Sequence, residues 1–129
     1  MRTLSKIVAC WMALLSLTAC DNRESQDTAG EVNLYSSRHY DTDLALYDDF
    51  TRDTGIQVNR IEAGADELIA RIQSEGESSP ADLLITVDAG RLWRAEQAGI
   101  FQAVNSAVLT ERLPANMRHP EGLWTGLSK

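Results

Sequence analysis

Strand-like and helix-like segments alternate three times between residues 32 and 99, and this order restricts the folds that the chain can adopt. The helix-like segments carry apolar residues at helical spacing and end in glycine, as Leu44, Tyr47 and Phe50 do before Gly55. The strand-like segments between them are short apolar runs. A β-α-β-α-β-α order predicts an α/β fold built on a parallel sheet.

Capping residues and turns set the expected boundaries. Asp41 or Thr42 is the predicted N-cap of the first helix. The later segments are strands over 56–61 and 81–87, a helix with Leu68, Ile69 and Ile72 on one face that closes at Gly76, a helix between a capping Asp88 and Gly99, and a short helix over 106–112. The run 81–87 is almost continuously apolar, which predicts a strand buried on both faces. Residues after Gly122 have the pattern of a strand being entered.

The N-terminal segment has the features of an export signal. Two cations, Arg2 and Lys6, precede an apolar stretch over residues 7–17 that is too short to remain as a membrane span. The sequence Leu17-Thr18-Ala19-Cys20 fits a bacterial lipobox, in which Cys20 is lipidated and becomes the mature N-terminus. An ordinary signal peptide that contains a cysteine is the alternative.

This interpretation divides the chain into a signal peptide over 1–19, a polar flexible tether over 20–31 and a folded part over 32–129. Acyl chains on Cys20 would anchor the protein to a membrane. Asp21 resembles a retention signal for the inner membrane, so the expected location is the periplasm, with a lipid anchor in the inner membrane.

Cysteine content and charge exclude several classes of function. The chain has two cysteines, of which one lies in the predicted signal and the other is Cys20, so no thiol remains for zinc or an iron–sulfur cluster. Loss of Arg2 and Lys6 with the signal changes the formal net charge from −7 to −9. A chain this acidic is a poor nucleic-acid binder.

Potential ligand residues follow the first predicted strand directly, in the sequence Ser37-Arg38-His39-Tyr40. Ligands of open α/β sheets bind beyond the carboxyl ends of the strands, where these residues are expected. Imidazole and phenolate suit a hard trivalent metal that tolerates one nitrogen ligand. From the residues alone, a metal site and a loop whose side chains bond to nearby backbone are equally supported.

Three segments, over residues 32–43, 79–84 and 88–96, resemble the periplasmic ferric-iron-binding proteins of bacterial ABC importers. The resemblance implies a parallel-sheet lobe of a two-lobed, type II-like periplasmic binding protein, with the second lobe missing from this chain. It implies that Fe(III) binds in the interlobe cleft and passes to an ABC permease in the inner membrane, with no catalysis. His39 and Tyr40 would be the ligands from this lobe, and tyrosines of the second lobe would complete the site.

The resemblance also gives expectations for neighbouring residues. Arg38 would balance a synergistic anion such as carbonate, or the phenolate, although a surface ion pair with Asp41 or Asp43 is equally supported. Ser37, near the start of a helix, is a weaker candidate for the anion site. Some members of the family place a carboxylate ligand where this chain has Val87, and the neighbouring Asp88 is better placed as a helix cap.

Three rival interpretations remain open. The chain could belong to a receptor for another small ligand, such as an oxyanion, a polyamine or a sugar. It could be a metalloenzyme that uses His39 with Asp41, or an inactive truncated product. Trp93 is expected in the core, and His119 in a loop without a specific partner.

Overall fold

A computed structural model describes residues 30–126, and these form an α/β unit around a three-stranded parallel sheet. The strands are β1 (Glu31–Ser36), β2 (Gln57–Glu62) and β3 (Leu83–Ile85), arranged in the order β2-β1-β3. The fold class predicted from the sequence is therefore confirmed. The predicted Cys20 anchor and the signal segment lie outside the described residues.

The register of the sheet brings the carboxyl ends of all three strands to one edge. Ser36, the last residue of β1, pairs with Glu62 of β2 on one side and with Ile85 of β3 on the other. The central position of β1 explains why its last three residues are fully buried. A loop that leaves β1 at this edge starts between the ends of both neighbouring strands.

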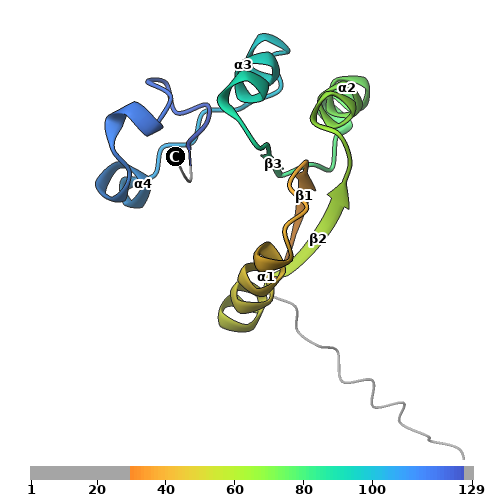
Figure 1. The fold of residues 1–129 in the computed structure, drawn as a ribbon, viewed down its shortest axis with the longest axis vertical. Coiled ribbons are helices and arrows are strands. Elements are labelled where there is room, and N and C mark those ends of the chain that lie inside the picture. The colour runs from red at the N-terminus through yellow and green to blue at the C-terminus, as the bar shows by residue number, and fades with distance from the viewer. Residues whose placement is uncertain (1–29, 127–129) are drawn as a thin grey trace, which may run out of the picture.

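Helices cover both faces of the sheet, as the connections of a parallel sheet require. Figure 1 shows α1 on one side of the sheet and α2 with α3 on the other. The helices are α1 (Asp41–Thr54), α2 (Ala65–Glu75), α3 (Ala89–Gln97) and α4 (Ala107–Arg112), with short 3-10 turns at Gly76–Ser78 and Ala115–Met117. Among these helices, within residues 30–126, none has the length and apolar character needed to cross a bilayer.

The core is small and lies between the sheet and α2. It consists of Leu34 and Tyr35 from β1, Ala65, Leu68 and Ile69 from α2, and Ala95 from α3. Leu68 and Ile69 are two of the three residues whose spacing predicted the apolar face of this helix. Their neighbours Asp66 and Glu67 lie in the first turn, where the helix dipole stabilises carboxylates.

The predicted N-cap of α1 is wrong by one or two residues. Tyr40 occupies the cap position with extended backbone, and its side chain makes no capping hydrogen bond. Asp41 is already the first helical residue, and the Asp43 carboxylate is bound by Arg38 instead of by free backbone N–H groups. The other end agrees with prediction, because Gly55 adopts the left-handed conformation at φ 75° and its N–H donates to Thr51.

Asp88 caps α3, as the sequence predicted. Its carboxylate accepts a hydrogen bond from the Arg91 backbone N–H at 2.9 Å and pairs with the Arg91 guanidinium. The backbone hydrogen bond, followed in importance by the guanidinium, lowers the pKa of Asp88. This carboxylate is therefore a structural group at the start of α3.

The third strand differs from its prediction in length and burial. It spans Leu83–Ile85 instead of residues 81–87, and the side chains of Leu83 and Val87 are about half exposed. Trp93 of α3 is also exposed, at 59%, and is not a core residue of the described part. For the strand the reason is topological: β3 is an edge strand, and no described strand pairs with its outer side.

The segment after α3 folds back on itself instead of entering a strand. Ser106 caps α4, in agreement with the predicted helix, and the Val104 N–H donates to the Gly122 carbonyl at 3.0 Å. Gly122 has φ 76°, and a Cβ there would lie 2.8 Å from the Val104 oxygen, so glycine is required. The expected final strand is reduced, among the described residues, to a single antiparallel bridge between Arg118 and Thr125.

Candidate metal-binding site

The loop from β1 to α1 is anchored to the sheet before it reaches the candidate ligands. The Ser37 N–H donates to the Ile85 carbonyl at 2.9 Å, and its hydroxyl donates to the same oxygen at 3.3 Å. The Ser36 hydroxyl accepts a hydrogen bond from the Arg38 backbone N–H and donates one to the Arg38 carbonyl, each at 3.1 Å. Both serines are thus turn residues that fix the loop at the edge of the sheet.

Arg38 forms a two-pronged ion pair with Asp43. Its Nε and Nη2 donate to the two carboxylate oxygens at 3.0 and 3.2 Å, which is the surface-pair alternative considered for this residue. The hydrogen bond to Asp43 raises the pKa of Arg38. The guanidinium also lies over the Tyr40 ring, 5.1 Å from its centroid. The cation therefore stands beside the phenol even while it is paired with Asp43.

His39 and Tyr40 lie together at the carboxyl edge and face solvent. The His39 side chain is 56% exposed, and its Nδ1 lies 3.3 Å from Oε2 of Glu62. Tyr40 is 57% exposed. Within residues 30–126, no three histidine, cysteine, aspartate or glutamate side chains are grouped so that they could hold a metal. The described residues supply a pair of potential ligands and not a closed site.

Burial distinguishes Tyr40 from the other two tyrosines of the chain. Tyr35 is fully buried, and desolvation together with the Glu75 hydrogen bond raises its pKa. Burial and the nearby Asp43 carboxylate raise the pKa of Tyr47. Both effects keep those phenols protonated, which opposes binding to a metal. Tyr40 is the tyrosine whose oxygen solvent and a metal can reach most easily.

Tyr35 instead belongs to a structural cluster that sequence analysis missed. Its hydroxyl donates to the Glu75 carboxylate at 3.1 Å, and that carboxylate also accepts from Arg71 and Ser79, each at 2.7 Å. The Arg71 guanidinium lies 5.1 Å from the centre of the Tyr35 ring. The cluster joins the central strand to the end of α2. The pairing of Arg71 and Glu75, four residues apart in a helix, was its only sequence signal.

Glu62 is a functional candidate that sequence analysis missed. It ends β2 and therefore lies beside the loop that leaves β1. Its carboxylate contacts both His39, at 3.3 Å, and Arg60, at 3.0 Å. The signal was available in principle, because residues that end neighbouring parallel strands meet at one edge.

His119, predicted to lack a specific partner, has several. Its Nε2 lies 3.4 Å from the Glu96 carboxylate, which also accepts from the Trp124 indole N–H at 2.8 Å. Its ring is tilted against that of Trp124 with centroids 5.3 Å apart, and its Nδ1 accepts from the Glu121 N–H. These contacts fasten the C-terminal segment to α3. The prediction that His119 lies in a loop is confirmed, and the prediction that it has no specific partner is wrong.

Sequence comparison relates the chain to iron-uptake proteins. It is 60% identical over 107 residues to Iron uptake protein A2 of Synechocystis, which covers 83% of this chain and 30% of that protein. It is 34% identical over 86 residues to the Major ferric iron-binding protein of Neisseria gonorrhoeae, covering 67% of this chain and 23% of the relative. The chain thus spans about a third or less of the length of these relatives. No family model matches it.

Solved structures agree with the sequence comparison. The Trichodesmium protein IdiA (FutA), solved with iron and citrate, is 63% identical with a TM-score of 0.73, and the match covers 75% of this chain and 31% of that one. The ferric binding protein of Campylobacter jejuni is 42% identical with a TM-score of 0.69, over 70% of this chain and 29% of its own. These relatives are named for iron binding and uptake, not for an enzymatic activity.

Proposed function

We propose that this chain, a homologue of one part of the periplasmic ferric-iron-binding proteins, supplies two of the ligands by which such a protein captures ferric iron. His39 and Tyr40 are the proposed ligands. The observation that carries the proposal is the position of an exposed imidazole and an exposed phenol on adjacent residues, at the edge where all three strands end.

The proposed chemistry is binding and release, with no bond made or broken in a substrate. Phenolate oxygen and neutral imidazole nitrogen donate to Fe(III), and the remaining ligands come from outside residues 30–126, from a second lobe. Closure of the two lobes would hold the ion until an ABC permease receives it. Protonation occupies the lone pair of the imidazole nitrogen and removes the negative charge of the phenolate, so binding weakens in acid.

Arg38 supports binding through charge and not as a ligand. Its cation lies 5.1 Å from the centre of the Tyr40 ring, where it would balance the negative charge of an iron-bound phenolate. Both carboxylate oxygens of Asp43 already bind Arg38. The capacity of Arg38 to bind a synergistic anion such as carbonate is therefore reduced. Ser37 likewise uses its hydroxyl on the Ile85 carbonyl. We therefore assign Arg38 to the phenolate and leave the anion to other groups.

The location proposed for the protein is the periplasmic face of the inner membrane, with a lipid anchor at Cys20. The support is the order of a positive segment, an apolar stretch and the Leu-Thr-Ala-Cys sequence, followed by a polar tether. Incorporation of labelled palmitate into the wild-type chain in a bacterial host, and its loss in Cys20→Ser, would support the anchor. Equal labelling of both would contradict it.

The proposed ligands are best tested in a chimera. The 107 aligned residues of Synechocystis Iron uptake protein A2 would be replaced by those of this chain. We expect ferric iron to give a visible charge-transfer band characteristic of iron–phenolate bonds, weakened in Tyr40→Phe, and a lower ferric affinity in His39→Ala. Tyr47→Phe serves as the matched control. A band and an affinity unchanged in both ligand variants would refute the assignment.

A further inference from the structure

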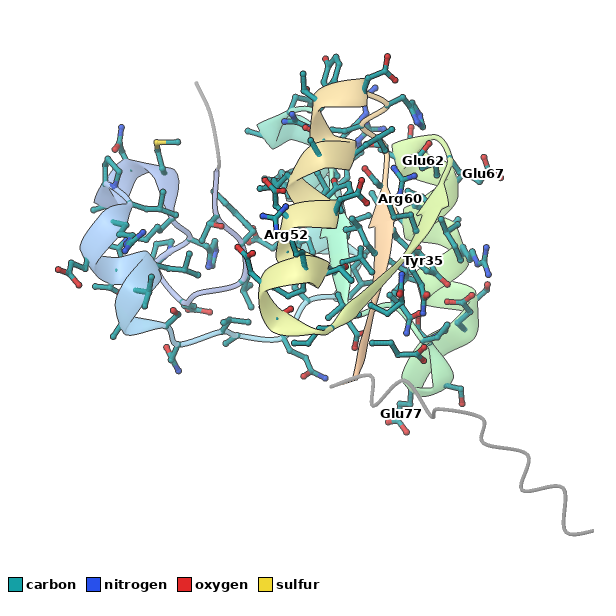
Figure 2. All side chains as sticks on the ribbon, turned by 90° about the horizontal axis from the view of Figure 1, so that it is seen from below. Tyr35, Arg52, Arg60, Glu62, Glu67 and Glu77 are labelled. Atoms are coloured by element: carbon teal, nitrogen blue, oxygen red, sulfur yellow. The ribbon has the colours of Figure 1, made fainter. Side chains whose placement is uncertain are left out.

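Glu62 lies where it can hold the His39 ring in one orientation. Its carboxylate oxygen Oε2 is 3.3 Å from Nδ1 of that ring. Glu62 ends β2, and His39 lies in the loop that follows β1, the strand paired with β2. The other oxygen, Oε1, accepts from Arg60 at 3.0 Å. Figure 2 shows Glu62 and Arg60 near one end of the sheet, with Glu77 near the other.

The Glu62 carboxylate is in turn positioned by Arg60. The Arg60 guanidinium donates to Glu62 and lies over the Tyr47 ring, 5.6 Å from its centroid. Tyr47 is a residue of α1, the helix that begins directly after His39 and Tyr40. The contacts thus run from α1 through β2 back to the loop before α1, and they restrict where the Glu62 oxygens can point.

The contact with Glu62 determines which nitrogen of His39 is free. An ionised carboxylate can only accept a hydrogen bond, so Nδ1 of a neutral His39 must carry the proton. The lone pair then resides on Nε2, and the ring is more than half exposed. In metal sites a carboxylate that accepts from one imidazole nitrogen orients the ring and makes the other nitrogen a better donor.

We propose that Glu62 is a positioning residue for His39, which fixes the tautomer with Nε2 unprotonated and presents that nitrogen to the metal. This inference rests on the proposed function, in which His39 is a ligand. The plain alternative is a surface ion pair, because Glu62 is 38% exposed. The two differ in one respect: a surface pair would not govern the tautomer of the neutral ring.

The tautomer can be measured without iron by nitrogen-15 NMR of the histidine rings in the 129-residue chain. The measurement is made at about pH 8.5, where an ordinary imidazole is neutral. The chain has two histidines, and they should report opposite forms. His119 accepts from the Glu121 N–H at Nδ1, so its proton belongs on Nε2. Wild-type His39 is expected to carry its proton on Nδ1.

The decisive variant is Glu62→Ala, which is expected to move the His39 proton mainly to Nε2 and leave His119 unchanged. Glu62→Gln keeps a neutral acceptor and should give an intermediate population. Glu67→Gln is the matched control, since Glu67 is exposed on the following helix and its side chain has no hydrogen bond among the described residues. Amide spectra of each variant check that the fold is retained. An unchanged His39 tautomer in Glu62→Ala would overturn the proposal.

A second measurement connects the tautomer to binding. In the chimera, Glu62→Ala is expected to lower ferric affinity roughly 10- to 100-fold, the usual effect of losing such a carboxylate. A changed tautomer with unchanged affinity would also overturn the positioning role. If His39→Ala itself leaves affinity unchanged, the proposed function fails instead. The two hypotheses therefore fail in distinguishable ways.

Discussion

The three tyrosines show how strongly the surroundings of a residue determine its chemistry. Tyr35 and Tyr47 have raised pKa values, because burial disfavours their phenolate forms. Tyr40 lies on the surface beside Arg38 and is more than half exposed. Sequence analysis selected Tyr40 from its position after the first strand. It had no means of seeing that Tyr35 is bonded to a carboxylate 40 residues away.

Exchanging one tyrosine hydroxyl at a time should separate stability from metal binding. Tyr35→Phe removes the hydrogen bond to Glu75 and is expected to lower the free energy of unfolding by about 1–2 kcal/mol. The ferric band of the chimera should be unaffected. Tyr40→Phe should do the reverse. Urea titration measures the first effect and visible absorption the second, and the assignment is wrong if Tyr35→Phe removes the band.

At the scale of elements, the strands and helices follow the sequence closely and their ends less so. Apolar spacing located β1, α1, β2, α2 and α3, and Gly55 and Asp88 ended or began helices as predicted. The cap of α1 was misplaced because the helix already begins at Asp41, and Tyr40 takes the cap position without any side-chain hydrogen bond. A cap that makes no side-chain hydrogen bond leaves no mark in the sequence, because capping is predicted from side chains that can accept one.

The cap of α3 predicts an acid-sensitive stability. The pKa of Asp88 is lower in the folded chain than in the unfolded chain. Its contribution to the free energy of unfolding is therefore complete at pH values above the pKa of the unfolded chain, and it is lost as pH falls through the pKa of the folded chain. Asp88→Ala should lower the melting temperature by a few degrees at neutral pH and remove this part of the acid dependence. Thermal melts of wild type and variant between about pH 2 and 7 test this, and parallel curves would contradict it.

At the scale of the whole molecule, apolar residues gather on surfaces that the described residues leave uncovered. Leu83, Val87 and Trp93 are each about half exposed or more, on and after the edge strand β3. Their apolar pattern predicted burial, and within residues 30–126 that prediction failed; the sheet has no described strand beyond β3. The relatives are about three times longer than the aligned part of this chain, so more of their sequence is available to cover such a face.

The exposed edge should make the 129-residue chain associate when it is prepared alone. Unpaired strand edges flanked by apolar side chains favour contact between chains. Sedimentation velocity is expected to show concentration-dependent association that Leu83→Lys reduces, whereas Glu77→Lys, at an exposed position away from β3, does not. A wild-type chain that stays monomeric at all concentrations would contradict this expectation.

Iron binding by the same preparation should be weak. His39 and Tyr40 are two donors, and no further histidine, cysteine or carboxylate group completes a metal site in residues 30–126. We expect the chimera to bind ferric iron much more tightly than the 129-residue chain, as measured by competition with citrate. Equal affinities would show that this chain contains a complete site.

The short separation of His39 and Glu62, 23 residues apart in sequence, has a consequence for the order in which a binding site matures. Both residues belong to the first strand–helix–strand unit, whose contacts close early because little chain must be looped to form them. The imidazole would therefore be oriented before any donor from later in the chain arrives. Metal binding would then start at an already oriented His39 nitrogen, and donors from later in the chain would join it afterwards.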